Sequence, residues 1–434
     1  MTYETVIGIE VHVELNTKTK MFCRCPADYF GAKPNTHTCP VCLGLPGALP
    51  AINQGAIKKC IQIGLALNCS INEQSYFERK NYFYPDLPKG YQISQLVKPI
   101  CINGSLTLDI GKVIRINRAH QEEDTGKLIH VGSETLIDFN RSGVPLVEIV
   151  TEPDFSSSEE VRDYAKKLQQ IFRYLGVSNA DMEKGDMRLE ANVSVRPVGQ
   201  KELAPYRVEL KNINSFRFMV AAIEYEVTRQ IKALEKGEKL TQETRGWNEA
   251  KKETYLQRSK EEAHDYRYFP EPDLPEFRDM GKVLGIKDNR IELPAKKAAK
   301  YQEDLGLSKQ QADILANSKE LAEYFEKIVE LGVEKDISPV QIANCILNRK
   351  INVDEISPEE VLKGIQSKSS GIISDEDELE KLVKEAIEEN PNAVADYKTG
   401  KTNALQVIIG YIMKKTSGKA NPQKVREILF SLLQ

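Results

Sequence analysis

The chain has 434 residues, a length that favours two or three domains over a single hydrophobic core. Apolar residues make up 41% and charged residues 29%, the profile of a soluble globular protein. No apolar stretch approaches the roughly 20 residues that a membrane span needs, and the formal net charge of −4 excludes a basic field over the whole protein.

The N-terminus lacks a basic segment followed by an apolar run, so no signal peptide is expected. Eight cysteines without a secretory signal indicate reduced thiols and metal ligands rather than disulfides. We therefore expect the protein to work in the cytoplasm.

Residues 1–293 are rich in short alternating runs and turn signals, which predict strands. In the first run, apolar residues alternate with Glu10, His12 and Glu14, which share one face. Many of the runs have no helix between them, so a mostly antiparallel sheet is expected. The predicted strands cover residues 7–15, 112–117, 146–150, 187–195 and 206–211.

Two helices interrupt this region. The first begins at a capping box of Ser157 and Glu160 and ends at Gly176. The second covers residues 217–236 and ends at Gly237. Their apolar faces are more typical of a hydrophobic core than of a binding surface.

After Pro294 the sequence becomes charged and amphipathic, which predicts helices, with starts at Ser308, Ser357 and Ser374. A linker-like stretch at 367–371 separates a helical domain, 294–372, from a small helical tail domain, 373–434. The fold class is therefore α+β.

The tail is basic at its end: residues 401–434 contain six Lys or Arg and one acid, whereas residues 375–389 contain eight acids and two lysines. A basic terminal segment can contact phosphates even in an acidic protein. A solvated helical surface is the alternative.

Cys23, Cys25, Cys39 and Cys42 form two close pairs, the pattern of a closed tetrahedral zinc site that has a structural role. His37 is an alternative fourth ligand, and incidental pairs are the remaining interpretation. The other four cysteines are scattered and are expected to be buried.

Acidic residues fall on several predicted strands. Glu10 and His12 share one face, Glu148 interrupts an apolar face, and Glu190 and Glu209 lie in further strands. A dense acidic turn at 120–124 adds to them. Carboxylates gathered from different strands bind Mg²⁺, usually together with substrate phosphates. Solvated outer-face residues are the alternative, which fits Glu148 least.

The common nucleotide motifs are missing, and neither a G-x-S-x-G elbow nor a Ser/Gly-rich amidase run is present. If the protein uses ATP, it does so through a carboxylate-based site. If it needs ammonia, another polypeptide must produce it.

Residues 79–86 and 264–273 combine aromatic side chains with cations and prolines. Such side chains can stack on unpaired bases at an RNA end. A rigid, proline-locked loop is the structural alternative.

Long motifs resemble the GatB/GatE family. They are VIGIEVHVELNTKTKMFCRC (6–25), FERKNYFYPDLPKGYQISQ (77–95), AHQEEDTGK (119–127), FNRSGVPLVEIVTEPD (139–154), VELKNINSFRF (208–218) and SKEEAHDYRYFPEPDLP (259–275). Together they cover most of residues 1–290. NPNAVADYKTGKTNAL and GKANPQKVREIL, near the C-terminus, resemble the family's tRNA-binding tail domain.

The resemblance implies a cradle-shaped catalytic domain at 1–293 in a heterotrimeric ligase, whose other two subunits are an amidase and a small third chain. The amidase releases ammonia from glutamine. The resemblance implies that the chain described here would use Mg-ATP to phosphorylate the side-chain carboxylate of Glu-tRNA(Gln) or Asp-tRNA(Asn), and that ammonia would then displace phosphate. A scaffold that presents tRNA without catalysing the reaction is the alternative.

The resemblance also implies roles for individual residues. The catalytic residues would be Glu10, His12, Glu123, Glu148 and Glu209. These five and Glu190 would be the Mg²⁺ ligands, with Glu122 as an alternative to its neighbour Glu123. Phosphate, cofactor or ammonia contacts would fall to Lys80, Lys89, Lys211 and Asn212. The cysteine quartet would hold structural zinc.

Two features depart from the family pattern. Glu190 stands where the family usually has Asp, one methylene shorter, which puts its ligand role in doubt. The helical region at 337–373 is shorter than usual, so contacts to the tRNA elbow through it are expected to be altered.

Overall fold

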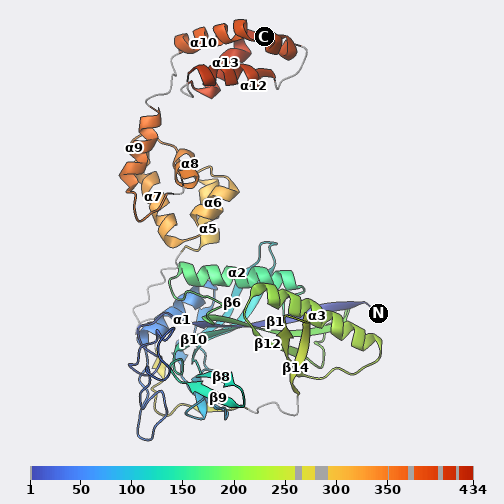
Figure 1. Ribbon diagram of the computed structural model, residues 1–434. Coiled ribbons are helices and arrows are strands. Elements are labelled where there is room, and N and C mark those ends of the chain that lie inside the picture. The colour runs from blue at the N-terminus through green and yellow to red at the C-terminus, as the bar shows by residue number, and fades with distance from the viewer. Residues whose placement is uncertain are drawn as a thin grey trace. The chain divides into compact units, whose positions relative to one another are not determined.

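The computed structural model describes residues 2–259, 266–278, 292–349, 351–369, 376–398, 404–416 and 420–433. It consists of two compact units, Met1–Lys296 and Lys297–Gln434, called here the N-terminal and C-terminal units (Figure 1). The division lies close to the boundary predicted at residue 293. The second predicted boundary, at residue 372, lies outside the described residues.

The N-terminal unit is built on a nine-stranded sheet in the order β14-β13-β12-β11-β1-β10-β7-β6-β2. Its neighbouring strands pair antiparallel, apart from the parallel pair of β12 and β13. This confirms the predicted α+β class with a mostly antiparallel sheet. The strand bounds are β1 Tyr3–Glu14, β2 Ser70–Ile71, β6 Cys101–Thr107, β7 Val113–Glu123, β10 Pro145–Thr151, β11 Met187–Pro197, β12 Val208–Ile213, β13 Glu243–Asn248 and β14 Glu253–Ser259.

Smaller sheets complete the unit. The strands β15 (Arg267–Pro270), β4 (Glu78–Asn81) and β5 (Tyr91–Ser94) form one of them. The other two pair β16 (Phe277–Arg278) with β3 (Gln74–Ser75), and β8 (Lys127–Val131) with β9 (Glu134–Asp138). The β15–β4 pair brings together two aromatic and cationic stretches that lie far apart in the sequence. Residues 264 and 265 of the second stretch lie outside the described residues.

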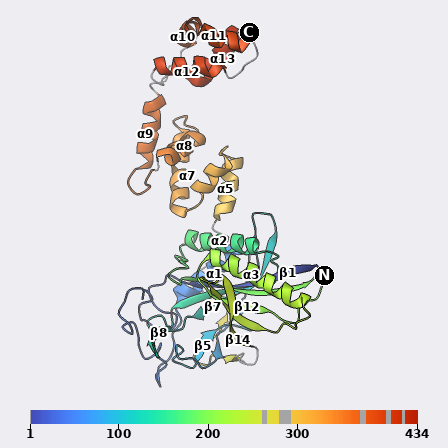
Figure 2. The ribbon, with the colours of Figure 1, turned by 45° about the vertical axis from the view of Figure 1, so that its right-hand side comes forward.

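Three helices cover one face of the large sheet: α1 (Gln54–Ala66), α2 (Ser158–Tyr174) and α3 (Phe216–Glu235) (Figures 1 and 2). Ile9, Val11 and Val13 of β1 are buried in the same hydrophobic cluster as residues of all three helices. Because successive side chains of a strand alternate, the polar residues of β1 lie on the opposite face.

The predicted helix starts are close to the observed ones. Ser157 caps α2 by accepting a hydrogen bond from the Glu160 amide. A complete capping box would also have the Glu160 carboxylate accept a hydrogen bond from the Ser157 amide. Here the carboxylate accepts from the amide of the preceding residue, Ser156, instead. Lys112 Nζ donates both to the same carboxylate oxygen, at 2.7 Å, and to Ser156 Oγ, at 2.9 Å.

The described residues after 293 are mostly helical and pack around two hydrophobic clusters. Ser308 and Ser357 both form capping boxes at helix starts, as predicted, whereas Ser374 lies outside the described residues. No described helix is long and apolar enough to cross a membrane. The helix bounds are α5 Pro294–Glu303, α6 Lys309–Leu315, α7 Lys319–Val333, α8 Pro339–Arg349, α9 Pro358–Ser369, α10 Glu376–Glu389, α11 Pro391–Lys398, α12 Leu405–Lys415 and α13 Pro422–Leu433.

Candidate functional site

Ionisable side chains gather on the face of the large sheet opposite the helices. In the strand ladder, Glu10 lies directly opposite Glu190, and His12 lies opposite Glu148. Glu148 in turn lies opposite His120 of β7. Directly opposed residues point to the same face, so strand pairing alone brings these five groups together.

The first set of groups, called here the histidine group, consists of His12, Glu122 and Glu148. One ligand atom from each lies within 4.8 Å of the others. The His12 Nε2 is 3.6 Å from Glu148 Oε2. Both carboxylates are almost fully buried, so they carry their charge inside the protein. Such a set of one imidazole and two carboxylates can hold a divalent cation.

His120 joins the two carboxylates of the histidine group. Its Nε2 lies 3.2 Å from Glu122 Oε1 and 3.3 Å from Glu148 Oε2. Burial works against the charge on His120, but Glu148 and Glu122 outweigh it and raise its pKa to about 9. The two histidines beside Glu148 hold its pKa well below the usual range, against the effect of burial. The two imidazoles therefore stabilise the negative charge of Glu148.

Glu122 is fixed further by two residues of β5. Ser94 donates its hydroxyl proton to Glu122 Oε1, and Gln92 Nε2 lies 3.1 Å from Oε2. Lys80, on the neighbouring strand β4, faces the same charges. Burial opposes the charge on Lys80, but Glu122 and Glu148 raise its pKa above its ordinary value. Lys80 therefore stays a cation beside the histidine group.

The second set, called here the carboxylate group, consists of Glu10, Glu190 and Glu209, whose oxygens also lie within 4.8 Å of one another. Lys211 Nζ lies 2.8 Å from Glu190 and 3.3 Å from Glu209. Burial, with Glu148 and Glu190 nearby, raises the pKa of Glu10. Three carboxylates with one lysine leave excess negative charge, which a cation would neutralise.

The side chains around the carboxylate group orient it. Asn192 donates to Glu10 Oε1 at 2.9 Å, and Thr244 of β13 donates to Glu209 Oε2 at 3.0 Å. Glu190 belongs to the group although its side chain is one methylene longer than the Asp that the family usually has at this position. Asn212, by contrast, is exposed, with a φ of 60°, and none of the described contacts joins it to the group.

A cavity of about 440 Å³ borders the carboxylate group. Glu10 and Asn192 line one side of it, and Tyr206 and Gln242 line another. Gly8, also in its wall, is a position of β1 that carries no side chain into the space. The cavity is therefore a concave site with one acidic residue, Glu10, in its wall.

Glu123 lies apart from the histidine group. Its carboxylate forms an ion pair with Lys89 and accepts from the Ile93 amide at 2.9 Å. Glu123 and Lys89 line a second cavity, of about 190 Å³. The same cavity is lined by Cys23 and Cys42, so the cysteine loop forms one of its walls.

The four predicted cysteine ligands do come together: the sulfur atoms of Cys23, Cys25, Cys39 and Cys42 lie within 4.8 Å of one another. His37 is not among them. The Cys39 amide points at Cys42 Sγ, 3.2 Å away. A hydrogen bond from Cys23 and the nearby Lys20 charge outweigh burial and lower the pKa of Cys42 to about 4.

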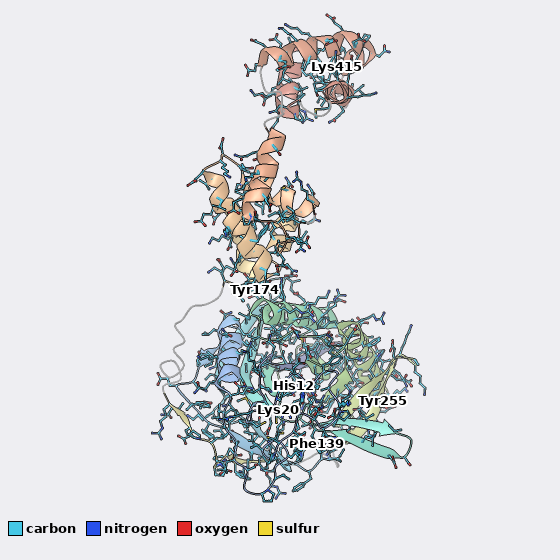
Figure 3. All side chains as sticks on the ribbon, turned by 60° about the vertical axis from the view of Figure 1, so that its left-hand side comes forward. His12, Lys20, Phe139, Tyr174, Tyr255 and Lys415 are labelled. Carbon is cyan, nitrogen blue, oxygen red and sulfur yellow. The ribbon has the colours of Figure 1, made fainter. Side chains whose placement is uncertain are left out.

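Lys20 is the cation that supports this thiolate. Its side chain is fully buried, with Nζ 3.5 Å from Cys42 Sγ and 3.2 Å from the Phe139 carbonyl oxygen (Figure 3). Four converging thiols with a thiolate and a buried counter-charge fit a tetrahedral zinc ion. The other cysteines are free; Cys60, Cys69 and Cys101 are buried, as expected, whereas Cys345 is only half-buried, so the prediction was wrong for it.

Comparison with known protein families covers nearly the whole chain. A family model described as the GatB/GatE catalytic domain matches residues 5–283, and one described as the GatB domain matches residues 301–433. The chain belongs to the GatB/GatE family. The histidine group, the carboxylate group, the cysteine loop and the two cavities lie within the part that the GatB/GatE catalytic domain covers.

Full-length relatives extend this result. The proteins named as the B subunit of aspartyl/glutamyl-tRNA(Asn/Gln) amidotransferase from Thermotoga maritima and Persephonella marina are 46% and 45% identical over 100% of both chains. The Brevibacillus brevis protein of the same name is 44% identical over 99%. The Thermotoga alignment spans 483 residues, so about 49 positions have no residue in this GatB/GatE chain.

Sequence reasoning missed several residues of the site: His120, Gln92, Ser94, Asn192 and Thr244. His120 belongs to the dense acidic stretch at 120–124, which was predicted as a turn, whereas the structure extends β7 through Glu123. The others depend on pairing between strands that are distant in sequence.

Proposed function

We propose that this chain is the B subunit of a tRNA-dependent amidotransferase, a carbon–nitrogen ligase. It would use ATP to phosphorylate the side-chain carboxylate of Glu-tRNA(Gln), Asp-tRNA(Asn) or both, and then transfer ammonia to the activated carbonyl. The observation that carries this proposal is the pair of acidic groups on one face of the sheet, beside a cavity. The names of the full-length relatives support it.

The residues fit magnesium and a nucleotide. The histidine group and the carboxylate group would each hold Mg²⁺ through carboxylate oxygens, the donors that this ion prefers. The adjoining cavity of about 440 Å³ would receive the nucleoside part of ATP, with its phosphates toward Glu10. Magnesium, when bound, neutralises charge on the phosphates and the transferring phosphoryl group.

The chain's own residues would position the reactants. Lys80 and Lys211, both cations beside the carboxylates, would stabilise negative charge that develops on the phosphoryl oxygens. A side-chain oxygen of the aminoacyl group attacks the γ-phosphorus, and the bond to ADP breaks. Ammonia then attacks the acyl phosphate carbon, phosphate leaves with the C–O bond electrons, and the new amide nitrogen loses a proton.

The ammonia would come from a partner. The sequence has no amidase motif, so an amidase subunit would supply it, in a complex that also contains a small third chain. The cysteine loop would bind structural zinc: with four sulfur ligands no coordination position is left for substrate. The C-terminal unit would bind the misacylated tRNA. The free cysteines are consistent with a cytoplasmic protein.

A scaffold that only presents tRNA is the second candidate. It leaves unexplained why buried carboxylates are held by Ser94, Gln92 and His120 in a geometry that converges on one point. Burying a charged group costs free energy unless the group is paired, hydrogen-bonded or bound to a metal ion. A cation held by these carboxylates would account for their burial.

Release of γ-phosphate distinguishes the two candidates. The complex with its amidase would be reconstituted with Glu-tRNA(Gln), and phosphate release measured for Glu10→Ala, His12→Ala and the exposed control Glu134→Ala. We expect the first two variants to lose at least about 100-fold in rate, while glutamine hydrolysis continues in the absence of amidation. Unchanged turnover in both variants would refute the catalytic function and leave the scaffold.

A further inference from the structure

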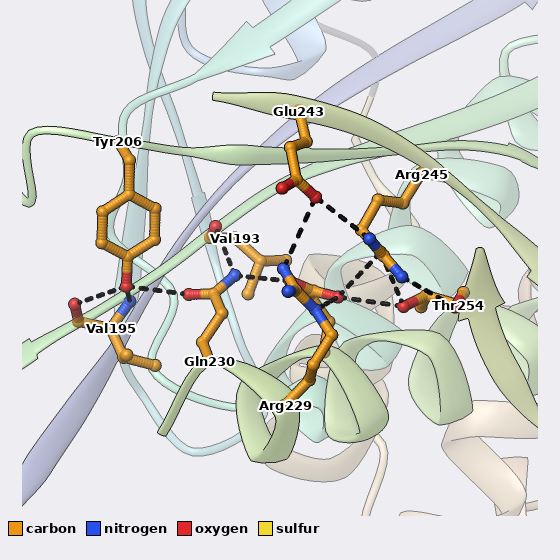
Figure 4. Close-up of polar contacts among 9 residues, drawn as sticks. Val193, Val195, Tyr206, Arg229, Gln230, Glu243, Arg245 and Thr254 are labelled. Atoms are coloured by element: carbon orange, nitrogen blue, oxygen red, sulfur yellow. Dashed lines mark hydrogen bonds and ion pairs between the residues drawn. The ribbon is translucent and has the colours of Figure 1, made fainter. Parts of the chain in front are cut away.

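The strand β13 presents different side chains to the two faces of the sheet. On the polar face, Thr244 lies directly opposite Glu209 of β12 and donates its hydroxyl proton to Glu209 Oε2 at 3.0 Å. On the other face, Glu243 and Arg245 point toward α3 (Figure 4). Their opposed residues on β12, Val208 and Leu210, are fully buried in the core. One strand thus joins the carboxylate group to the interior.

A partly buried set of charges lies beneath β13. Its centre is Glu226 of α3, whose side chain has no exposed surface. The Glu226 carboxylate accepts from Arg229 at 2.7 Å and from Gln230 at 2.9 Å, both on the same helix. It also accepts from Thr254 of β14 at 3.0 Å, and Arg245 Nε lies 3.5 Å away. The contacts of this carboxylate therefore join three elements (Figure 4).

Glu243 completes the set, called here the α3 charge cluster: Glu226, Arg229, Glu243 and Arg245. Glu243 Oε2 lies 3.0 Å from Arg245 Nη1 and 3.7 Å from Arg229 Nη2. Two carboxylates and two guanidinium groups balance one another, which allows the Glu226 carboxylate to be fully buried. Because each arginine contacts both acids, the cluster fixes the position of β13 along its length.

The backbone pairing of β13 with β12 fixes that position weakly. Its parallel pairing with β12 covers three residue pairs, from Val208↔Glu243 to Leu210↔Arg245. On its other side, the register with β14 shifts between Thr244 and Arg245. A shift by one residue would turn Thr244 toward α3 and bring a charged side chain to Glu209.

We propose that Thr244 is a positioning residue for Glu209, and that the α3 charge cluster holds β13 in the register that this role requires. The inference rests on the proposed function, in which Glu209 is a magnesium ligand. Glu209 is bound on one oxygen by Lys211 and on the other by Thr244. The hydroxyl fixes the rotation of the carboxylate, so that it faces Glu10 and Glu190 before a cation arrives. Partners of this kind commonly alter metal affinity 10–100-fold.

The test uses the complete complex and Thr244→Val, which keeps the branched shape and removes the donor. The concentration of Mg²⁺ that gives half-maximal γ-phosphate release should rise about tenfold. Thr244→Ser, which keeps the hydroxyl, should restore a near wild-type value. The matched control is Thr107→Val, an exposed threonine in β6 of the same sheet. Glutamine hydrolysis by the amidase, which needs no residue of β13, should be equal in all variants.

Direct binding supplies a second measurement that does not depend on turnover. Mn²⁺ binding to the complex, followed by electron paramagnetic resonance, should weaken in Thr244→Val and remain in Thr244→Ser. Glu209→Gln is the reference variant and should raise the Mg²⁺ requirement. If it does, and Thr244→Val has the Mn²⁺ affinity and the Mg²⁺ requirement of the wild type, the inference is overturned. If Glu209→Gln also had no effect, the metal role of Glu209 would fail, and the role of Thr244 with it.

A double-mutant cycle tests the contribution of the α3 charge cluster. Arg229→Lys keeps the charge and loses the forked contact with Glu226 and Glu243. If the cluster acts through Thr244, this variant should raise the Mg²⁺ requirement, and the double variant with Thr244→Val should be no worse than Thr244→Val alone. Multiplicative effects of the two changes would show that the cluster acts by another route.

Discussion

At the scale of single residues, His120 determines how the site responds to pH. Its pKa is raised to about 9 from 6.5 because Glu148 and Glu122 outweigh the effect of burial. A raised pKa means that the proton stabilises the metal-free fold below pH 6.5, and that this contribution is lost as the pH rises through about 9. A divalent cation in the histidine group would oppose the same proton.

We therefore expect Mg²⁺ affinity to increase as the pH rises toward about 9. Calorimetric titration with Mg²⁺ in buffers of different ionisation enthalpy would measure both affinity and released protons. His120→Gln should flatten the pH dependence, whereas the exposed His130→Gln should leave it unchanged. Identical slopes in wild type and His120→Gln would contradict this account.

Neighbouring residues Glu122 and Glu123 should differ in effect. Glu122 lies in the histidine group, whereas Glu123 pairs with Lys89 in the smaller cavity. Glu122→Gln should lower γ-phosphate release at least about 100-fold, and Glu123→Gln should lower that step less than about tenfold. Single-turnover measurements with Glu-tRNA(Gln) separate this step from amidation. A larger loss in Glu123→Gln would reverse the assignment.

The sequence predicted a turn at 120–124, whereas the structure extends β7 through Glu123, and this difference separates the two glutamates. Because successive side chains of a strand alternate, His120 and Glu122 lie on one face of the sheet and Glu123 lies on the opposite face. The resemblance to a family pointed to Glu123 and kept Glu122 as the alternative, because a motif aligns residues without stating which face they occupy. The structure adds the partner of each carboxylate, which the motif does not contain.

At the scale of elements, prediction was best where the signal is local. The apolar alternation of β1 and the caps at Ser157, Ser308 and Ser357 depend on residues within one element, so the strand and the helix starts were found. The pairing of β4 with β15, and of Thr244 with Glu209, joins residues far apart in the chain. No local period encodes such a register, so these contacts needed the three-dimensional structure.

The cysteine loop is an element whose stability should depend on metal. The purified chain should contain about one zinc ion, measured by atomic absorption. Cys42→Ser should lose the zinc and lower the melting temperature by several degrees, roughly 2–4 °C for each kcal/mol lost. The scattered Cys345→Ser, in α8, is the matched control and should keep the metal. A zinc-free preparation with the wild-type melting temperature would rule out a structural metal.

At the scale of the whole molecule, chemistry and tRNA binding should be separable. Every described group that could hold a metal lies in the N-terminal unit. The C-terminal unit has its own hydrophobic clusters, and the last two helices carry exposed cations on a chain with net charge −4. Uneven charge of this kind favours local contact with a phosphate backbone, which salt weakens.

Charge reversal at the C-terminal helices should therefore affect the tRNA substrate and spare the chemistry. Lys414→Glu with Arg426→Glu replaces two exposed cations, one on α12 and one on α13. The KM for Glu-tRNA(Gln) should rise about tenfold near physiological salt, with a shallower salt dependence, because counterion release at two phosphates is lost. Turnover at saturating tRNA and glutamine hydrolysis should stay unchanged. Lys363→Glu, an exposed lysine of α9, is the matched control. A fall in kcat at unchanged KM would place these helices in the chemical step instead of in tRNA binding.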